Sequence, residues 1–389
     1  MIFNNTKQAY IHKTDKELYR ALCLFRIISN KRIVFFGSKI AQFTLRYRLP
    51  IIGLFKHTIF KQFCGGLKKE DSIELVDRLD EMGVKSYMHY AAEHQNSESE
   101  MDINVEKTIE TISFSKNTSA LPFTVFKPTS FGSFSLFEKK SSGVALDFKE
   151  SESWNRIIKR IKKCCSYADK LNVRILIDAE ESWVQDAIDE ISEDMMKKFN
   201  HKKTLIFTTV QLYRKDRLKY LDNLFKRSVK KKFKIGIKLV RGAYIEKENK
   251  RSLELGVSSK ICSSKNATDK NFNAALEYIL NRIKECELFL GSHNEKSVIK
   301  VIDWMKKNNL PTNYSKIWFS QLYGMADHIS FNLASKGYQV VKYIPYGPIK
   351  EVIPYLIRRA QENSSVSSQT SRELYLIRKE LKRRSIKEV

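Results

Sequence analysis

The feature that most constrains the fold is a regular alternation of short apolar runs with longer amphipathic stretches, which begins after Cys64-Gly65-Gly66. Short apolar runs are typical of buried parallel strands, and the longer stretches between them are typical of helices. Eight strands alternating with helices over about 280 residues are the number and size expected of a (β/α)8 barrel. We place the strands at 84–90, 123–127, 173–178, 204–210, 234–240, 288–291, 316–320 and 339–344.

The two ends of the chain are predicted to be helical. Residues 15–28 and 38–49 carry apolar side chains at helical spacing, residues 361–370 read as a polar, serine-rich loop, and a basic helix resumes at 371. We therefore expect an α/β protein with an N-terminal helical segment (1–62), a barrel (63–365) and a basic helical tail (366–389). A doubly wound open sheet is the alternative fold, but the glycine-rich phosphate loop that usually follows its first strand is missing from this sequence.

The net charge of +26 is the most unusual bulk property. One interpretation is binding to nucleic acid or to an anionic membrane surface. The other is a lysine-rich composition with no functional meaning. We favour the second interpretation because the basic residues are spread along the chain rather than gathered in one stripe. We therefore expect no nucleic-acid partner, and a membrane surface ranks next.

Cysteine usage and the N-terminus bear on the compartment. The six cysteines form no Cys-x-x-Cys pair or Cys/His cluster, so we expect no metal site and reduced thiols, as in the cytoplasm. The N-terminus lacks the zones of a signal peptide. The apolar stretch 32–55 is interrupted by Lys39, Arg46 and Arg48. We interpret it as an amphipathic helix pair rather than a membrane span, with contact to a membrane surface as the alternative.

Polar side chains occupy the predicted carboxyl ends of seven strands, which is where the chemistry of a (β/α)8 barrel takes place. A single polar residue at such a place is commonly a structural cap. Seven together would line one cavity with cations, carboxylates and amides, which is the mixture that a flavin requires. These residues are Lys127, Asp178, Gln211, the run from Lys238 to Tyr244, Ser292 with His293, Gln321 and Tyr343.

Two consecutive arginines, Arg358 and Arg359, lie in the helix predicted after the eighth strand. Neighbouring side chains point about 100° apart on a helix, so both guanidinium groups can reach one small carboxylate. Glu362 follows at helical spacing and can brace either arginine. The alternative is a surface arginine pair with an ordinary helical salt bridge.

The chain resembles proline dehydrogenase, in the stand-alone form found in bacteria and mitochondria, over roughly residues 60–365. The resemblance rests on Lys238-Leu-Val-Arg-Gly-Ala-Tyr244, Gly324-Met-Ala-Asp-His328 and Tyr355-Leu-Ile-Arg-Arg-Ala-Gln-Glu-Asn363, in this order. It implies a distorted (β/α)8 barrel with non-covalent FAD that oxidises L-proline to Δ1-pyrroline-5-carboxylate. It also implies that electrons pass to a membrane quinone, which favours a cytoplasmic protein peripherally attached to the inner membrane face.

The resemblance also implies roles for individual residues. The expected substrate contacts are Lys127, Tyr343, Arg358, Arg359 and Glu362, with the arginines at the proline carboxylate and Tyr343 over the ring. Asp178 is expected near the reacting centre, positioning Lys127, and Lys238 near the flavin N5 edge, so these two are the predicted catalytic residues. The expected FAD contacts are Ala179, Gln211, Lys238, Arg241, Gly242, Ala243, Ser292, His293 and Gln321.

Several points stay open at this level. Lys238 stands where many bacterial members of the family have arginine, and His89 stands where an aspartate is more usual. The group that takes the proton of the proline amine is Lys127 beside Asp178, or water. A residue smaller than Tyr343 goes with hydroxyproline in the family, so Tyr343 favours proline. The alternatives are an enzyme for hydroxyproline or another cyclic imino acid, an inactive relative, and a nucleic-acid-binding protein.

Overall fold

The fold is an eight-stranded parallel sheet whose strands alternate with helices along the chain. The computed structural model describes residues 2–46, 56–91, 97–365 and 367–386. The strand order is β1-β8-β7-β6-β5-β4-β3-β2, which is that of a (β/α)8 barrel, so the predicted fold class is confirmed. The strands are β1 (Val84–Tyr90), β2 (Phe123–Phe126), β3 (Arg174–Ile177), β4 (Ile206–Gln211), β5 (Ile235–Val240), β6 (Cys286–Gly291), β7 (Ile317–Leu322) and β8 (Val340–Tyr346).

Every predicted strand overlaps an observed one. The prediction for β1 matches at both ends, and the other seven differ by at most two residues at an end. The difference that matters is in β8, which continues to Tyr346 because its last residues pair in parallel register with β1. Tyr343 therefore lies in the middle of β8 and not at its carboxyl end.

The chain divides into two compact units. The first unit comprises Met1–Ala91, His293–Tyr314 and Phe319–Val389, and the second comprises Ala92–Ser292 and Ser315–Trp318. This is a different partition from the segments 1–62, 63–365 and 366–389, which stay a prediction.

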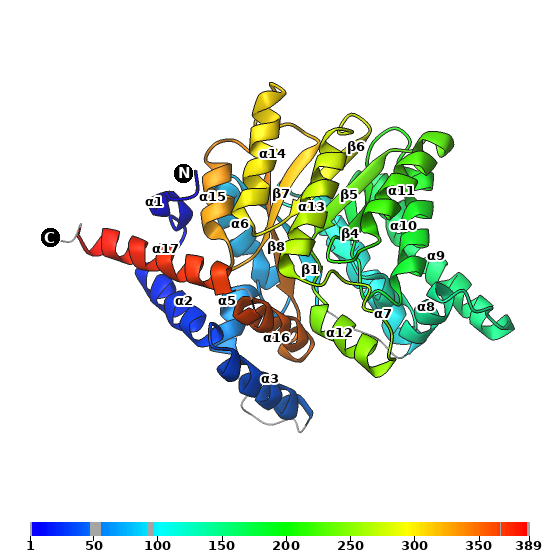
Figure 1. Ribbon diagram of the computed structural model, residues 1–389, viewed down its shortest axis with the longest axis horizontal. Helices are drawn as coiled ribbons and strands as arrows, with labels where there is room; N and C mark the ends of the chain where they lie inside the picture. Colours follow the sequence, from blue (N-terminus) through cyan, green and yellow to red (C-terminus); the bar gives the residue numbers. More distant parts are fainter. Residues whose placement is uncertain (1, 47–55, 92–96, 366, 387–389) are drawn as a thin grey trace. The chain divides into compact units, whose positions relative to one another are not determined.

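The second unit contains β2 to β6 and an aromatic core. The ring of Phe123, at the start of β2, meets Phe207, Phe289 and Trp318 edge to face, with centroids 5.6, 5.0 and 5.1 Å apart. Figure 1 shows α9 and α10 beside these strands. The helices are α7 (Glu98–Lys116), α8 (Phe134–Ser141), α9 (Phe148–Leu171), α10 (Gln185–Phe199), α11 (Arg217–Lys231), α12 (Ile245–Glu254) and α13 (Lys265–Leu280), with the 3-10 turn η3 (Pro128–Phe131).

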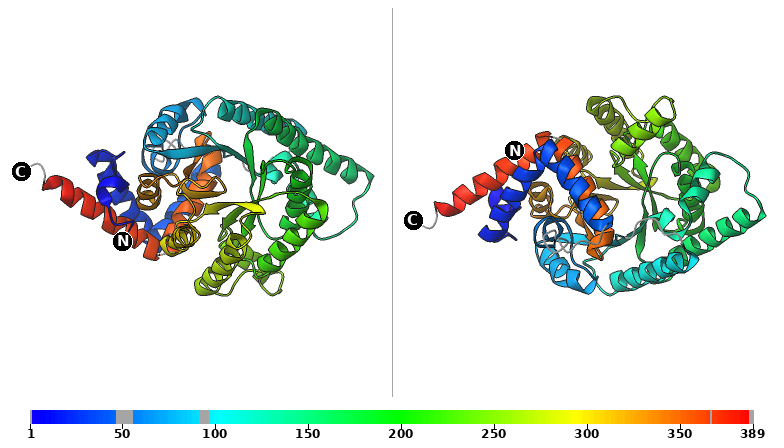
Figure 2. Two further views of the ribbon diagram at one scale, coloured as in Figure 1. Left: turned by 90° about the horizontal axis from the view of Figure 1, so that it is seen from above. Right: turned by 90° about the horizontal axis from the view of Figure 1, so that it is seen from below.

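The first unit brings the two ends of the chain together. The Arg384 guanidinium donates to the carbonyl oxygens of Tyr10 and Lys13, both at 2.9 Å, and pairs with Asp15 at 2.6 Å. Figures 1 and 2 show α17 lying along α2. The helices are α1 (Thr6–Ala9), α2 (Asp15–Ile28), α3 (Lys31–Arg46), α5 (Lys61–Phe63), α6 (Ile73–Glu81), α14 (Glu295–Lys307), α15 (Asp327–Ala334), α16 (Ile349–Ser365) and α17 (Ser367–Ser385), with η1 (Lys56–Phe60) and η2 (Glu70–Ser72).

The predicted loop at 361–370 is wrong. Helix α16 continues to Ser365 and α17 begins at Ser367. The polar side chains that suggested a loop bond to the backbone near them: Asn363 donates to the Arg359 carbonyl at 2.7 Å, and Thr370 to the Asn363 carbonyl at 2.6 Å. Such bonds let serine-rich and asparagine-rich segments stay helical when packing favours it.

The N-terminal helices follow the prediction with one shift. Helix α2 has the predicted bounds, because Thr14 and Glu17 form a capping box at its start. The helix predicted at 38–49 begins earlier, at Lys31, and residues 47–55 lie outside the described residues. All six cysteines are free thiols. Within the described part of the chain, each helix is too short or too polar to cross a bilayer.

A buried ion cluster of the first unit centres on Asp327, the first residue of α15. The Asp327 carboxylate lies 2.6 Å from the Lys13 ammonium and 2.8 Å from the Lys342 ammonium. The Nε2 atom of His12 is 3.5 Å away. Burial alone would raise the pKa of Asp327, but Lys13 and Lys342 outweigh that effect and hold it well below its ordinary value.

Replacing Asp327 should destabilise the protein strongly. In Asp327→Asn, two buried ammonium groups lose their countercharge, and we expect the free energy of unfolding at pH 7 to fall by about 3–5 kcal/mol, measured by urea denaturation. Asp222→Asn removes an exposed ion pair with Lys226 and should leave the free energy almost unchanged. Equal stabilities of the two variants would contradict this role for Asp327.

The lowered pKa of Asp327 also makes the stability of the protein depend on pH. The pKa of Asp327 is lower in the folded than in the unfolded state, so its contribution is complete above the unfolded value. The contribution is lost as the pH falls from about 4 through the depressed folded-state pKa. We expect acid unfolding of Asp327→Asn to lack this component when it is followed by circular dichroism beside the wild type.

Candidate active site

An ion pair joins Asp178, the residue after β3, to Lys238 inside β5 in the second unit. The Lys238 ammonium lies 2.6 Å from Asp178 Oδ1, and the side chains are 8% and 17% exposed. Lys238 lies in the buried part of β5, and Asp178 follows the last residue of β3. The two predicted catalytic residues are therefore in direct contact. Asp178 holds Lys238 in place, while its predicted role in positioning Lys127 stays a prediction.

Arg241, the residue after β5, is held from three sides. Its Nε donates to Asp269 at 2.7 Å, one of its terminal nitrogens donates to the Ser292 hydroxyl at 3.0 Å, and its guanidinium stacks 4.1 Å from the Phe272 ring centre. Burial lowers the pKa of Arg241, and Asp269 counteracts that effect. The guanidinium is thus a fixed, largely desolvated cation, which is the kind of group that binds a phosphate.

The turn after Arg241 requires glycine. Gly242 has a φ of +129°, and a Cβ atom there would lie 2.4 Å from the Tyr213 ring. Only glycine fits this position without moving Tyr213. The predicted run from Lys238 to Tyr244 therefore holds one paired cation, one fixed cation and one tight turn.

A buried carboxylate, Glu180, organises the ends of β2, β3 and β4. It accepts hydrogen bonds from the Thr129 hydroxyl at 2.7 Å and from the Thr129 amide at 3.1 Å. Gln211 at the end of β4 donates to the Glu180 carbonyl at 2.7 Å. Burial raises the pKa of the Glu180 carboxyl to about 7, against the attraction of Lys127. Lys127 is thus within electrostatic reach of Glu180.

In the first unit, Tyr343 of β8 lies in a cluster of aromatic rings. Its hydroxyl is 2.6 Å from Nδ1 of His89. The rings of Tyr87, His89 and Tyr355 lie 5.3, 5.7 and 5.9 Å from the Tyr343 ring. His89, the residue that departs from the family pattern, therefore has a defined role: it fixes the hydroxyl end of Tyr343.

Helix α16 presents the predicted arginine pair. Arg359 is 7% exposed, and one of its terminal nitrogens lies 2.5 Å from Glu362, as predicted for a bracing carboxylate. Its guanidinium stacks 5.2 Å from the ring centre of Tyr355. The Nε atom of Arg359 is buried and has no hydrogen-bond partner among the described residues. Arg358 precedes it and is half-buried.

His293 and Gln321 belong to the same unit and are linked through β7. The Nε2 atom of His293 accepts a hydrogen bond from the Leu322 amide at 3.0 Å, which places the ring proton on Nδ1. Burial, with the nearby cations Lys342 and Arg359, lowers the pKa of His293 to about 3. His293 is therefore a neutral donor. The Gln321 side chain accepts from Ser330 at 2.7 Å.

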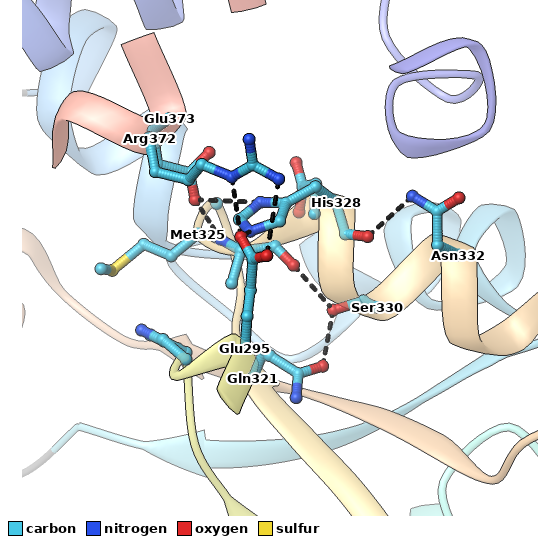
Figure 3. A network of polar contacts seen from close by, with 12 residues as sticks. Glu295, Gln321, Met325, His328, Ser330, Asn332, Arg372 and Glu373 are labelled. Atoms are coloured by element: carbon cyan, nitrogen blue, oxygen red, sulfur yellow. Dashed lines mark hydrogen bonds and ion pairs between the residues drawn. The ribbon is translucent and has the colours of Figure 1, made fainter. Parts of the chain in front are cut away.

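The Gly324–His328 motif builds the turn from β7 into α15. Gly324 has a φ of +77°, and a Cβ there would lie 2.0 Å from the Gln62 carbonyl oxygen. The Ala326 amide donates to Glu373 of α17 at 2.6 Å. Figure 3 shows His328 beside Glu295, 3.1 Å away, and Arg372 of α17 on the same carboxylate at 2.7 Å. This motif therefore has a structural role, because it fixes the turn that follows β7, the strand that carries Gln321.

Sequence reasoning missed the residues that hold the others in place. Asp269 contacts Arg241, Tyr355 contacts Tyr343 and Arg359, and Thr129 holds Glu180, whose backbone carbonyl binds Gln211. The partners of Asp269 and Thr129 are 28 and 51 residues away along the chain, so spacing gives no signal for these two residues. Ala179 is half-buried and Ala243 exposed, and their predicted FAD contacts stay predictions.

Comparison with known proteins identifies the same family that the sequence motifs resemble. The family model for proline dehydrogenase matches residues 72–372. The chain is 34% identical to the carbapenem antibiotics biosynthesis protein CarD of Pectobacterium carotovorum, over 98% of this chain and 99% of that protein. It is 31% identical to mitochondrial proline dehydrogenase 1 of Dictyostelium discoideum, over 98% of this chain and 74% of that protein.

Two further similarities are informative. A hydroxyproline dehydrogenase of Xenopus laevis is 29% identical over 96% of this chain and 88% of that protein. The structure of proline utilization A from Bdellovibrio bacteriovorus, inactivated by N-propargylglycine, superposes with a TM-score of 0.73 at 19% identity. That alignment covers 92% of this chain but only 41% of the other chain, and at this identity it supports the fold alone. The family match, together with relatives aligned over 98% of this chain, shows that this chain is an enzyme of the proline dehydrogenase family.

Proposed function

We propose that the enzyme oxidises L-proline to Δ1-pyrroline-5-carboxylate, with FAD as the hydride acceptor and a quinone as the final electron acceptor. The family assignment supports the reaction class. The observation that carries the substrate is Arg359, a buried guanidinium whose Nε lacks a hydrogen-bond partner among the described residues. A buried donor of this kind is costly unless an anion completes it. A carboxylate on a small ring is an anion of suitable shape.

The groups around Arg359 fit this substrate. Glu362 holds one side of the guanidinium fork and Tyr355 covers one of its faces, so the fork is oriented before the carboxylate arrives. Tyr343 offers an aromatic ring to the substrate, and His89 holds the hydroxyl of this tyrosine in place. Binding energy at the carboxylate is thereby converted into orientation of the ring, which brings the Cδ–H bond to a defined place.

The residues of the second unit fit a flavin dinucleotide. Arg241 is a fixed cation suited to a phosphate, the Gly242 turn admits close approach of a ligand to the backbone, and Lys238 is a positive charge held by Asp178. FAD, when bound, supplies the hydride acceptor. Lys238 would stabilise the negative charge that collects on the ring during reduction. Gln211 and Ser292 are the proposed amide and hydroxyl contacts in this unit, whereas His293 and Gln321 belong to the first unit and their FAD contacts stay predictions.

The arginine pair can be tested by kinetics. We expect Arg358→Ala and Arg359→Ala each to raise KM for proline at least tenfold, equivalent to about 1.4 kcal/mol, because the carboxylate loses a charged partner. Arg359→Lys should fall between wild type and Arg359→Ala, since lysine keeps the charge and loses the fork. Steady-state kinetics with a soluble dye acceptor gives these values.

The control for the arginine variants is Arg383→Ala. Arg383 pairs with Glu380 on α17 and has no proposed contact with substrate. Its KM should equal that of the wild type. An unchanged KM in both Arg358→Ala and Arg359→Ala would remove the carboxylate clamp from this account.

Tyr343 should determine the choice between proline and hydroxyproline. In Tyr343→Ser, the space of the phenol ring becomes available for a ring hydroxyl, and we expect the kcat/KM ratio of hydroxyproline to proline to rise at least tenfold. Tyr87→Phe, which keeps the neighbouring ring, is the matched control. A wild-type enzyme that prefers hydroxyproline would instead favour the second candidate function, suggested by the 29% identical hydroxyproline dehydrogenase.

The quinone acceptor places the reaction at a membrane. A quinone is dissolved in the bilayer, so we propose that the enzyme works in the cytoplasm, attached peripherally to the inner membrane face. Proline-dependent reduction of a quinone incorporated in lipid vesicles, followed by its absorbance, tests the acceptor directly. Turnover with a soluble dye but none with the quinone would reject this part of the proposal.

A further inference from the structure

Helix α3 has apolar residues on two sides, of which one is buried and one is exposed. Val34 and Ala41, 6% and 3% exposed, mark the face that packs against its neighbours α16 and α2. Other apolar residues recur at three- and four-residue spacing and therefore share a second side of the helix. These residues, here called the α3 outer face, are Ile33, Phe36, Ile40 and Phe43, which are 49%, 62%, 56% and 54% exposed.

The exposed apolar residues of the α3 outer face form a continuous stripe and are not scattered over the surface. Single exposed apolar side chains are ordinary, whereas a continuous stripe along one helix marks an interaction surface. Phe35, 55% exposed, borders the stripe and meets Phe36 edge to face at 5.5 Å. The Lys39 ammonium sits 4.4 Å over the Phe35 ring, so a cation lies at the edge of the apolar stripe.

The segment of the sequence that carries this helix contains only positive charges. The sequence has no Asp or Glu between Glu17 and Glu70, a stretch of 52 residues. At the chain average of 44 acidic residues in 389, such a stretch would carry about six. Lys31, Arg32 and Lys39 of α3 are exposed. The basic residues of the stretch are Arg20, Arg26, Lys31, Arg32, Lys39, Arg46, Arg48, Lys56, Lys61, Lys68 and Lys69.

We propose that the α3 outer face docks on an anionic lipid bilayer. The helix would lie in the plane of the surface, with Ile33, Phe36 and Ile40 at the boundary between headgroups and acyl chains. The flanking lysines and arginine would bind headgroup phosphates. An exposed apolar stripe bordered by cations is the pattern of helices that bind membranes in this way.

The charge argues against the other occupants. A second copy of the chain joined through this face would bring two acid-free, basic segments together, and like charges oppose such an interface. Nucleic acid would account for the cations but not for the large exposed apolar side chains. A bilayer with acidic headgroups satisfies both parts of the surface.

The position of α3 connects docking to the reaction. Helix α3 packs directly against α16, the helix that carries Arg358 and Arg359, and Figure 2 shows the two side by side. Docking would therefore hold the bilayer next to the helix that binds the substrate carboxylate. This link rests on the proposed quinone acceptor, whereas the docking surface itself does not.

Vesicle co-sedimentation of the full-length protein tests the proposal. The vesicles are phosphatidylcholine alone, or phosphatidylcholine with about a third phosphatidylglycerol, at low and high salt. We expect binding to the anionic vesicles, weakened by salt because the attraction is partly electrostatic. Phe36→Ser/Ile40→Ser and Arg32→Gln/Lys39→Gln should each lower the partition coefficient at least tenfold.

A matched variant controls for general loss of surface hydrophobicity. Val229→Ser/Leu253→Ser removes two apolar residues that are 70% and 84% exposed on α11 and α12. It should bind vesicles as the wild type does. All variants should keep wild-type turnover with a soluble dye, which shows that they are folded and active.

The outcomes separate docking from the acceptor. Wild-type protein that ignores anionic vesicles at low salt, or Phe36→Ser/Ile40→Ser protein that binds like wild type, overturns the proposal. Self-association in sedimentation velocity that Phe36→Ser/Ile40→Ser abolishes, without vesicle binding, would assign the face to a second copy and also overturn it. Vesicle binding that depends on the α3 outer face, without quinone reduction, rejects the acceptor and leaves docking standing.

Discussion

The first unit depends on one buried carboxylate with two ammonium partners. Asp327 joins Lys13, from the segment between α1 and α2, to Lys342 in the middle of β8. Because an unpaired charge is expensive at this depth, the three side chains fix one another. The N-terminal segment, the start of α15 and β8 are thereby held together. Strand β8 carries Tyr343 next to Lys342. The helical ends of the chain thus contribute to the position of a proposed substrate residue.

Charge pairing also distinguishes the cations proposed to bind FAD from the arginine proposed to bind the substrate. Lys238 is matched by Asp178, and Arg241 by Asp269 and Ser292, so both cations are fixed in position before any ligand binds. Arg359 differs, because Glu362 takes one end of its guanidinium while its buried Nε has no hydrogen-bond partner among the described residues. A cation that is oriented but incompletely satisfied is what a binding site for a small carboxylate requires.

The sequence predicted the barrel well and the support of the site poorly. Strand positions follow from local hydrophobic patterns, and the ion pair of Arg359 with Glu362 follows from helical spacing. The contacts of Asp269 with Arg241, Thr129 with Glu180 and His89 with Tyr343 join distant segments, so spacing carries no information about them. The loop predicted at 361–370 failed because composition alone does not reveal side-chain bonds such as Asn363 to the Arg359 carbonyl. The charge pattern of residues 18–69 was visible in the sequence, but its meaning depended on which side of α3 is exposed.

The central claim is that a flavin enzyme binds proline through Arg359, and one spectrum tests it most directly. The protein, reconstituted with FAD, is kept free of oxygen, and its absorbance near 450 nm is recorded before and after addition of L-proline. The account predicts that the wild-type flavin is bleached, and that Arg359→Ala needs at least tenfold more proline for half of the change. A flavin that stays oxidised at saturating L-proline, or a colourless protein that does not take up FAD, would contradict the account.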